Sequence, residues 1–251
     1  MSGHSKWSSI KHKKGAADAK RWQLFSKLSK AIIVAAKHGG GDPLNNLALQ
    51  NAIEKAKSYS MPKDNIDRAI AKGSGADADA DAFESITYEG YGPEGVAVIV
   101  EALTDNKNRT AADVRHLFAK HGGNLGTDGS VSWQFDRRGV VVVTAEGVDE
   151  EELFLVAVDG GADDIEQDGS GFLITSAPEL LAAVRGAVQE AGFGVESSEL
   201  MLIPKTTVAV EDEGKARQVM RLIDALEEND DVQDVYANFD IPEQVLEAVA
   251  G

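Results

Sequence analysis

The stretch ITYEGYGPEGVAVIVEAL, residues 86–103, decides the fold of this chain. It contains two strand-like segments, Ile86–Tyr91 and Val96–Leu103. Glycine and proline in the four residues between them are typical of a tight turn. The second segment opens with five apolar residues in a row, which is typical of a central strand. We therefore predict a hairpin in the middle of a sheet.

The residues after this hairpin predict the rest of its sheet. We expect a helix that begins near Thr110, because Thr110 and Asp113 resemble a capping box. A strand is expected over Val131–Phe135. The C-terminal part adds a strand, an amphipathic helix and a strand, at 206–210, 214–228 and 232–238. These last three elements complete the set that begins at residue 86.

The intervening residues, 137–204, form a second unit. Their pattern predicts strand, helix, strand, strand, helix and strand, at 139–144, 150–158, 162–167, 172–175, 178–191 and 195–203. This order is the ferredoxin-like βαββαβ pattern. The simplest topology inserts 137–204 between the two halves of a split α/β domain, 83–136 and 205–240.

Three helices precede the sheet. The first runs from about Ala16 to the glycines at 39–41, Asp42-Pro43 opens the second, and Gly73 ends the third. We predict a basic arm and helical domain over 1–72. Residues 73–82, GSGADADADA, lack large apolar side chains and are interpreted as a linker. The predicted fold class is α+β, with a three-helix domain followed by two α/β domains.

The charge of the chain is strongly asymmetric. Residues 1–38 hold nine Lys/Arg and one acid, in a chain of 251 residues with a net charge of −17. A basic arm on an acidic body favours binding to a polyanion. In the first helix, one face is apolar and the other is a lysine stripe of Lys20, Lys27, Lys30 and Lys37. The stripe could equally be the solvated face of an amphipathic helix.

We predict that the basic arm and the first helix contact nucleic acid. An aromatic ring can stack on an unpaired base, although Trp7 could instead pack on the helices. Lys107 and Arg109 lie in a strand-to-helix turn that could hold a phosphate or be a simple capped turn. The predicted nucleic-acid-binding residues are Lys6, Trp7, Lys11, His12, Lys13, Lys14, Lys20, Arg21, Lys27, Lys30, Lys107 and Arg109.

Several motifs resemble the YebC/PmpR family. They are GHSKW at 3–7, IKHKK at 10–14, DAKR at 18–21, GGGDP at 39–43, MPKDNI at 61–66, YEGYGP at 88–93 and the segments 104–116 and 121–133. The resemblance covers the first 135 residues with specific motifs and the remainder by pattern. Two residues depart from it, since Trp22 and Glu94 stand where members usually carry glycine.

The resemblance implies a regulator of gene expression. The family is described as DNA-binding transcriptional regulators, it includes a mitochondrial translational activator, and some members are described as ribosome-associated factors that relieve stalling on proline-rich stretches. The first hypothesis is therefore a DNA-binding transcriptional regulator. The second is a ribosome-associated translation factor that binds ribosomal RNA. A third, a phosphate-ligand enzyme using Lys107 and Arg109, lacks any acid, base or nucleophile that can be placed beside them.

The composition excludes several other classes. The absence of cysteine excludes disulfides and thiol catalysis and fits a reducing cytoplasm. No apolar run approaches the length of a membrane span, and the N-terminus lacks the apolar core of a secretory signal. No catalytic or metal-binding motif is recognisable, so we expect a protein that is not an enzyme and has no cofactor. We also expect it to be cytoplasmic and monomeric. The acidic runs 149–152 and 227–231 are interpreted as solvated faces that repel phosphate.

Overall fold

The computed structural model describes residues 18–75, 83–168 and 171–250. The first of these ranges folds into α2 (Asp18–Gly39), α3 (Leu47–Ser58) and α4 (Lys63–Ser74). Their shared core includes Leu28 and Ile32 from α2, Leu49 from α3 and Ile66 from α4. The predicted apolar face of α2 is confirmed, because all its residues belong to this core or pack against it: Leu24, Phe25, Leu28, Ile32, Ala35 and Ala36.

Two helix boundaries differ from those predicted. The second helix starts at Leu47 rather than after Asp42-Pro43, because the side chain of Asn46 accepts a hydrogen bond from the Leu49 amide at 3.1 Å and caps it there. The third helix ends at Ser74, one residue beyond the predicted stop at Gly73, and Gly73 is buried in its last turn. A Cβ at Gly73 would collide with the carbonyl oxygen of Ile33, so glycine is needed there for the close approach of α4 to α2.

The predicted hairpin forms the centre of the first sheet. β1 (Glu84–Tyr91) and β2 (Ala97–Thr104) pair antiparallel, with Tyr88 opposite Val100. The sheet order is β3-β1-β2-β9, where β3 is Asn124–Leu125 and β9 is Val232–Ala237. In the turn between β1 and β2, Glu94 has a φ of 59°, in the left-handed region that favours glycine.

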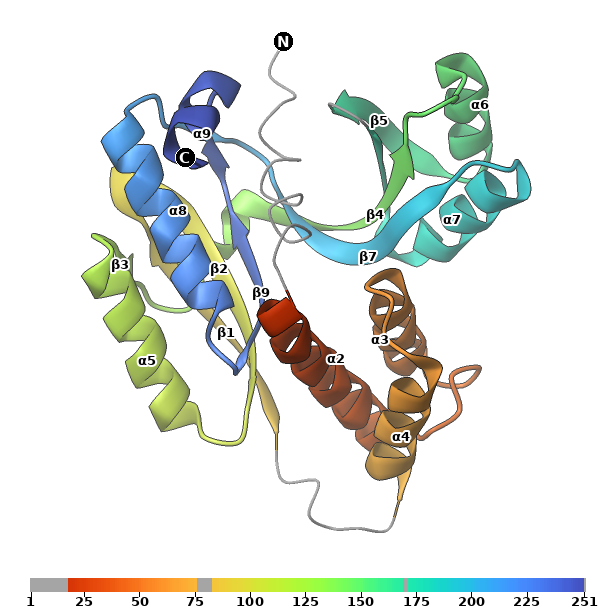
Figure 1. Ribbon diagram of the computed structural model, residues 1–251, viewed down its shortest axis with the longest axis horizontal. Coiled ribbons are helices and arrows are strands. Elements are labelled where there is room, and N and C mark those ends of the chain that lie inside the picture. The colour runs from red at the N-terminus through yellow and green to blue at the C-terminus, as the bar shows by residue number, and fades with distance from the viewer. Residues whose placement is uncertain (1–17, 76–82, 169–170, 251) are drawn as a thin grey trace.

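Two helices cover one face of this sheet, α5 (Lys107–Lys120) and α8 (Glu213–Glu227) (Figure 1). Phe118 of α5 and Leu222 of α8 pack with the strand residues Val98 and Val100. The C-terminal part also contains β8 (Val208–Ala209), β10 (Phe239–Asp240) and α9 (Glu243–Ala250), with β8 and β10 paired in parallel.

Two further predictions for this part are wrong in detail. The side chain of Asn106, not Thr110, caps α5, because it accepts a hydrogen bond from the Arg109 amide at 3.1 Å. Residues Ser132–Gln134 form a 3-10 turn, not part of a strand, and β4 begins at Phe135.

The second unit has the predicted βαββαβ order. Its elements are β4 (Phe135–Thr144), α6 (Glu150–Asp159), β5 (Ala162–Asp168), β6 (Gly171–Ser176), α7 (Leu181–Glu190) and β7 (Val195–Pro204). The strand order β5-β6-β4-β7 is antiparallel throughout, as in ferredoxin-like sheets. The predicted α+β fold class is therefore confirmed.

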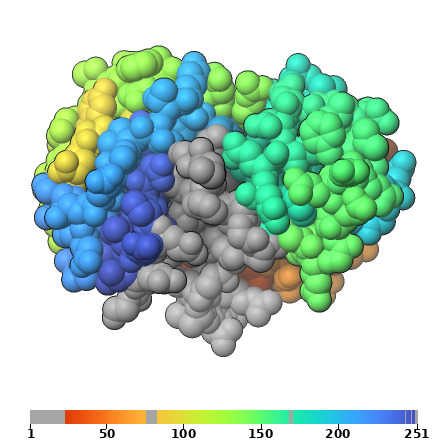
Figure 2. Space-filling view, turned by 90° about the horizontal axis from the view of Figure 1, so that it is seen from above, coloured from red at the N-terminus to blue at the C-terminus, as the bar shows by residue number. Residues whose placement is uncertain are grey.

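The two faces of the second sheet have different neighbours. Helices α6 and α7 cover one face, where Val141 and Val143 pack against Leu153 and Val184. On the other face, Val140 and Val142 belong to a core shared with Ile99 of the first sheet. In the space-filling view the blue C-terminal elements and the green-to-cyan second unit lie on opposite sides (Figure 2). The exact domain boundaries stay a prediction.

Candidate nucleic-acid interface

The structure describes only part of the predicted interface. Six of the predicted residues lie outside the described ranges: Lys6, Trp7, Lys11, His12, Lys13 and Lys14. Lys20 and Arg21 lie in the first turn of α2, where the structure describes the backbone. Lys27, Lys30, Lys107 and Arg109 are described with their side chains, and all four have acidic or carbonyl partners within the chain.

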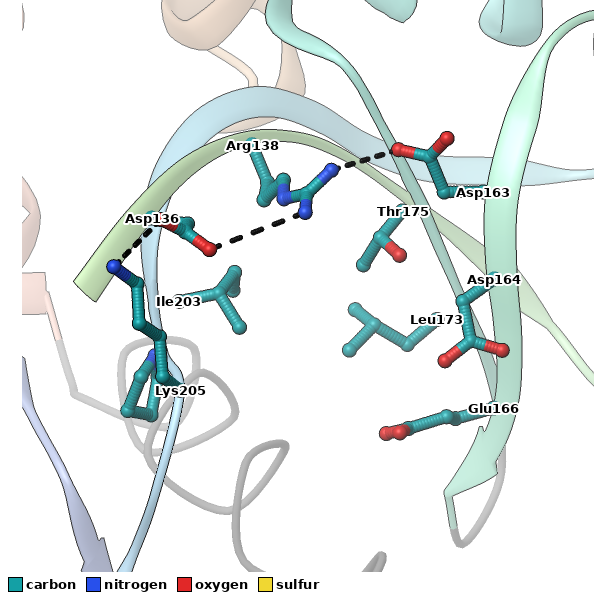
Figure 3. A pocket seen from close by; sticks show the side chains of 10 residues that line it. Asp136, Arg138, Asp163, Asp164, Glu166, Leu173, Thr175, Ile203 and Lys205 are labelled. Atoms are coloured by element: carbon teal, nitrogen blue, oxygen red, sulfur yellow. Dashed lines mark hydrogen bonds and ion pairs between the residues drawn. The ribbon is translucent and has the colours of Figure 1, made fainter. Parts of the chain in front are cut away.

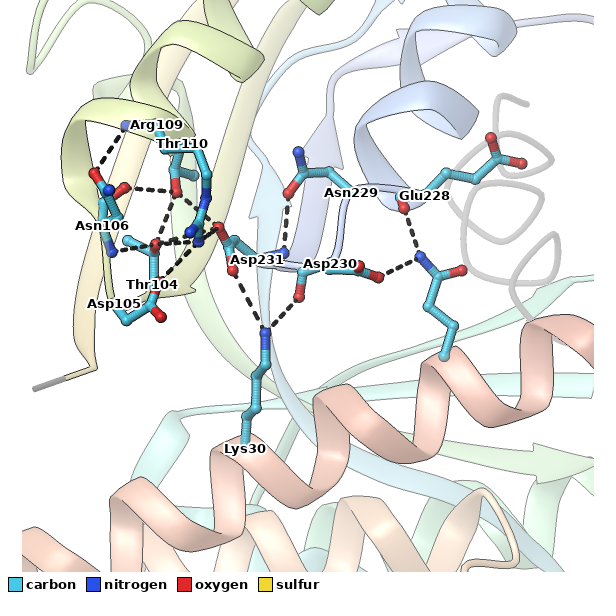
Figure 4. A network of polar contacts seen from close by, with 11 residues as sticks. Lys30, Thr104, Asp105, Asn106, Arg109, Thr110, Glu228, Asn229, Asp230 and Asp231 are labelled. Atoms are coloured by element: carbon cyan, nitrogen blue, oxygen red, sulfur yellow. Dashed lines mark hydrogen bonds and ion pairs between the residues drawn. The ribbon is translucent and has the colours of Figure 1, made fainter. Parts of the chain in front are cut away.

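The middle of the lysine stripe faces the C-terminal end of α8 (Figure 4). Lys27 Nζ donates to the carbonyl oxygen of Glu227 at 2.5 Å, and Lys30 Nζ donates to that of Asp230 at 3.1 Å. Gln23 Nε2 donates to the carbonyl oxygen of Glu228 at 2.5 Å. The last carbonyls of a helix lack partners within the helix and carry partial negative charge, so cations and amides are favourable there. The backbone of the acidic run 227–231 and the buried Asp231 therefore form an interdomain contact, whereas Glu228 and Asp230 are exposed, so the interpretation as a solvated face holds for only part of the run.

Asp231 is the centre of this contact. Its carboxylate accepts hydrogen bonds from Arg109 Nη2 at 2.7 Å, Thr110 Oγ1 at 2.9 Å and Thr104 Oγ1 at 3.2 Å, and Lys30 Nζ lies at 3.4 Å. Burial opposes ionisation, but the hydrogen bonds from Arg109 and Thr110 outweigh it and lower the pKa of Asp231. A carboxylate with this many donors joins α2, α5 and the loop before β9 into one polar cluster.

The predicted phosphate turn is a capped helix start with paired cations. Arg109 binds Asp105 at 2.8 Å as well as Asp231, and Lys107 forms an ion pair with Glu84. A phosphate would have to displace these carboxylates to reach either cation. Phosphate binding by Lys107 and Arg109, and nucleic-acid contact by Lys27 and Lys30, stay predictions.

Sequence reasoning missed a second interdomain ion cluster around Lys55 of α3. Lys55 Nζ lies 2.8 Å from Asp234 of β9 and 3.2 Å from Glu199 of β7. Burial would lower the pKa of Lys55, but the two carboxylates outweigh it and raise the pKa well above its usual value. Arg185 of α7 forms an ion pair with Glu54, also from α3. No local signal could have found these partners, because they are more than a hundred residues apart in the sequence.

A pocket of about 220 Å³ lies on the face of the second sheet opposite α6 and α7 (Figure 3). Arg138 binds Asp163 at 2.8 Å and Lys205 lies 3.2 Å from Asp136, while Leu173 and Ile203 are apolar neighbours. Four carboxylates face two cations here, from Asp136, Asp163, Asp164 and Glu166. This excess of negative charge disfavours a phosphate in the pocket. Within the described ranges, no group of three or more His, Asp or Glu side chains could hold a metal ion.

The fold and contacts define a class of protein in which a helical part with a lysine stripe packs against two acidic α/β units. Residues 5–76 match the family model described as TACO1/YebC protein N-terminal domain, and residues 83–239 match the model described as TACO1/YebC second and third domain. The chain therefore belongs to the TACO1/YebC family, which confirms the resemblance.

Relatives match over the whole chain. A protein of Rubrobacter xylanophilus named probable transcriptional regulatory protein is 59% identical over 251 residues and covers 100% of both chains. One of Desulforapulum autotrophicum with the same designation is 52% identical and covers 99% of this chain and 100% of its own. The crystal structure of a conserved hypothetical protein from Aquifex aeolicus is 48% identical, with a TM-score of 0.86 over 96% of this chain and 99% of that one. No helix among the described residues is long and apolar enough to cross a membrane.

Proposed function

We propose that this chain is a non-enzymatic regulator of gene expression that binds DNA through its basic N-terminal segment. The observation that carries the proposal is the charge asymmetry, nine basic residues against one acid in residues 1–38 of a chain with a net charge of −17. The names of the relatives, probable transcriptional regulatory proteins, support the regulatory role. We further propose that the protein acts in the cytoplasm as a monomer.

The hydrogen bonds of Lys27 and Lys30 bear on which of the predicted lysines contact phosphate. Lys27 and Lys30 already donate to α8 and to the loop that follows it, and Lys27 is only 9% exposed. We therefore assign the main phosphate contacts to the lysines upstream of α2, namely Lys6, Lys11, Lys13 and Lys14. The acidic α/β units repel phosphate, which keeps the main phosphate contacts at the basic end.

A second candidate function is a ribosome-associated translation factor that binds ribosomal RNA. It is favoured by the same resemblance to the YebC/PmpR family, which implies ribosome-associated factors as well as DNA-binding regulators. Crosslinking in cells, followed by sequencing of both bound DNA and bound RNA, separates the two. Promoter fragments support the first function, and ribosomal RNA supports the second.

The phosphate contacts are tested by a salt titration of binding to DNA and to ribosomal RNA. Each lost phosphate contact flattens the slope of log affinity against log salt by about 0.7–0.9. The K13A/K14A variant is therefore expected to flatten it by about 1.4–1.8. The matched control K120A/K215A removes two exposed lysines from α5 and α8 and is expected to keep the parent slope. Equal slopes for the parent and K13A/K14A would refute this assignment.

A further inference from the structure

Trp133 stands out among the exposed apolar side chains of the described residues. It is 68% exposed, although Val131 and Phe135 on either side of it are buried at 0% and 5%. The two buried neighbours anchor the segment in the core between the sheets, so the indole is held outside that core. An indole left in water forgoes the favourable burial of a large apolar surface.

The backbone that holds Trp133 is fixed by a buried carboxylate. Glu89 of β1 is 8% exposed and accepts hydrogen bonds from the amides of Gly129 at 2.8 Å, Val131 at 2.7 Å and Ser132 at 2.8 Å. Lys205 Nζ donates to the carbonyl oxygen of Trp133 at 3.0 Å. The ring is therefore presented in one place before any partner arrives, which reduces the entropy lost on binding.

The ring has no hydrogen-bond donor left to offer. Its Nε1 donates to the carbonyl oxygen of Ser130 at 3.1 Å, and Tyr91 Oη donates to the same oxygen at 2.8 Å. What Trp133 presents to solvent is therefore the flat, apolar surface of the indole. Such a surface suits a flat aromatic partner, because stacking needs only the two ring faces.

The surroundings favour a nucleobase over a protein side chain. A protein hot spot usually lies within a larger apolar patch, whereas Ser132, directly before Trp133, is exposed and polar, and the ammonium of Lys205 contacts the Trp133 carbonyl. The cations nearby are matched by carboxylates, since Lys205 faces Asp136 and Arg137 faces Glu101 at 3.6 Å. Stacking rather than charge attraction would therefore dominate binding.

We propose that Trp133 is a stacking site for an unpaired base of single-stranded nucleic acid. This inference rests on the proposed function and adds a second contact, outside the basic N-terminal segment. A base in a duplex is already stacked on its neighbours, so the site selects unpaired bases. Both RNA and DNA can supply them.

Tryptophan fluorescence tests this directly, because the chain has only three tryptophans. The variant W7F/W22F leaves Trp133 as the sole emitter. A single-stranded RNA, a single-stranded DNA of the same mixed sequence and their duplex are the probes. We expect the single strands to quench the emission at the concentrations at which the anisotropy of a labelled copy shows binding. The duplex should leave the emission unchanged.

Affinity provides the second readout. Trp133→Ala should weaken single-strand binding by about tenfold, equally at low and high salt, and Trp133→Phe should weaken it much less. Phe154→Ala is the matched control, because Phe154 is also an exposed aromatic, at 52%, but lies on the acidic helix α6. Thermal melting should be unchanged in all three variants.

The outcomes separate this inference from the proposed function. If the oligonucleotides bind while the emission of Trp133 and the affinity of Trp133→Ala stay as in the parent, the stacking site is refuted and nucleic-acid binding stands. In that case the ring serves a protein contact or none. If the parent binds no oligonucleotide at all, the proposed function fails and the stacking site fails with it.

Discussion

Replacing Asp231 with Asn removes one charge from the cluster that joins α2 to the first α/β unit, with almost no change in shape. The residue is 7% exposed, and its carboxylate accepts from Arg109, Thr110 and Thr104 at 2.7–3.2 Å. Asn keeps one acceptor oxygen and adds a donor amide, so at least one of these donors loses its partner. The charge of Arg109 also loses its more buried counterion.

The expected loss of stability follows from these contacts. A hydrogen bond to a charged group contributes about 1.5–3 kcal/mol, and an unpaired buried donor costs a similar amount. We expect Asp231→Asn to destabilise the fold by about 2–3 kcal/mol. For a chain of this length that lowers the melting temperature by roughly 4–12 °C. Lys30→Ala should cost only about 0.5–1 kcal/mol, since its side chain is partly exposed.

The effect should depend on pH in a defined direction. The folded-state pKa of Asp231 lies below its ordinary value, so its contribution is complete above the unfolded pKa of about 3.9. It is lost as the pH falls through the lower folded pKa. The stability difference between the parent and Asp231→Asn should therefore be constant at neutral pH and shrink in acid.

Thermal and urea unfolding at pH 7 measure the difference. Asp105→Asn is the matched control, because Asp105 binds the same Arg109 at 2.8 Å but is 49% exposed. It should change the free energy of unfolding by no more than about 0.5 kcal/mol. If Asp231→Asn and Asp105→Asn melt at the same temperature, the buried cluster does not stabilise the fold and the reasoning fails.

Three further substitutions test other contacts. Glu89→Ala leaves three buried or half-buried amides without an acceptor. The free energy of unfolding, measured in urea, should fall by about 2–4 kcal/mol. Normal amide-exchange protection at Val131 in this variant would contradict the expectation. Lys55→Ala should cost about 2–3 kcal/mol, and a double-mutant cycle with Asp234→Ala should give a coupling energy clearly above zero. Gly73→Ala should lower the free energy of unfolding by about 1–3 kcal/mol, because the added methyl group overpacks α4 on α2. A melting temperature equal to that of the parent would show that the two helices can move apart without loss of stability.

The sequence alone predicted the elements and their order. The hairpin at 86–103 and the βαββαβ unit at 137–204 were recognisable because alternation and helical periodicity are local properties. The wrong boundaries lie where tertiary contacts decide. Gly73 was predicted as a helix stop and lies in the last turn of α4, but the reason for glycine there is the close approach of the Ile33 carbonyl, which the sequence does not show. The apolar Val131 and Phe135 predicted a strand over 131–135. In the structure both residues are buried in the core between the sheets, and a 3-10 turn lies between them.

The sequence also determined the charge asymmetry and the lysine stripe, since both depend only on composition and helical spacing. Which acceptor each lysine meets was decided by the tertiary structure. Lys27 and Lys30 lie 200 residues from the carbonyls that they contact in the run 227–231, and they meet them because α2 docks against the end of α8. Charge attraction acts through space, and helical periodicity says which face a lysine occupies but not what that face will meet.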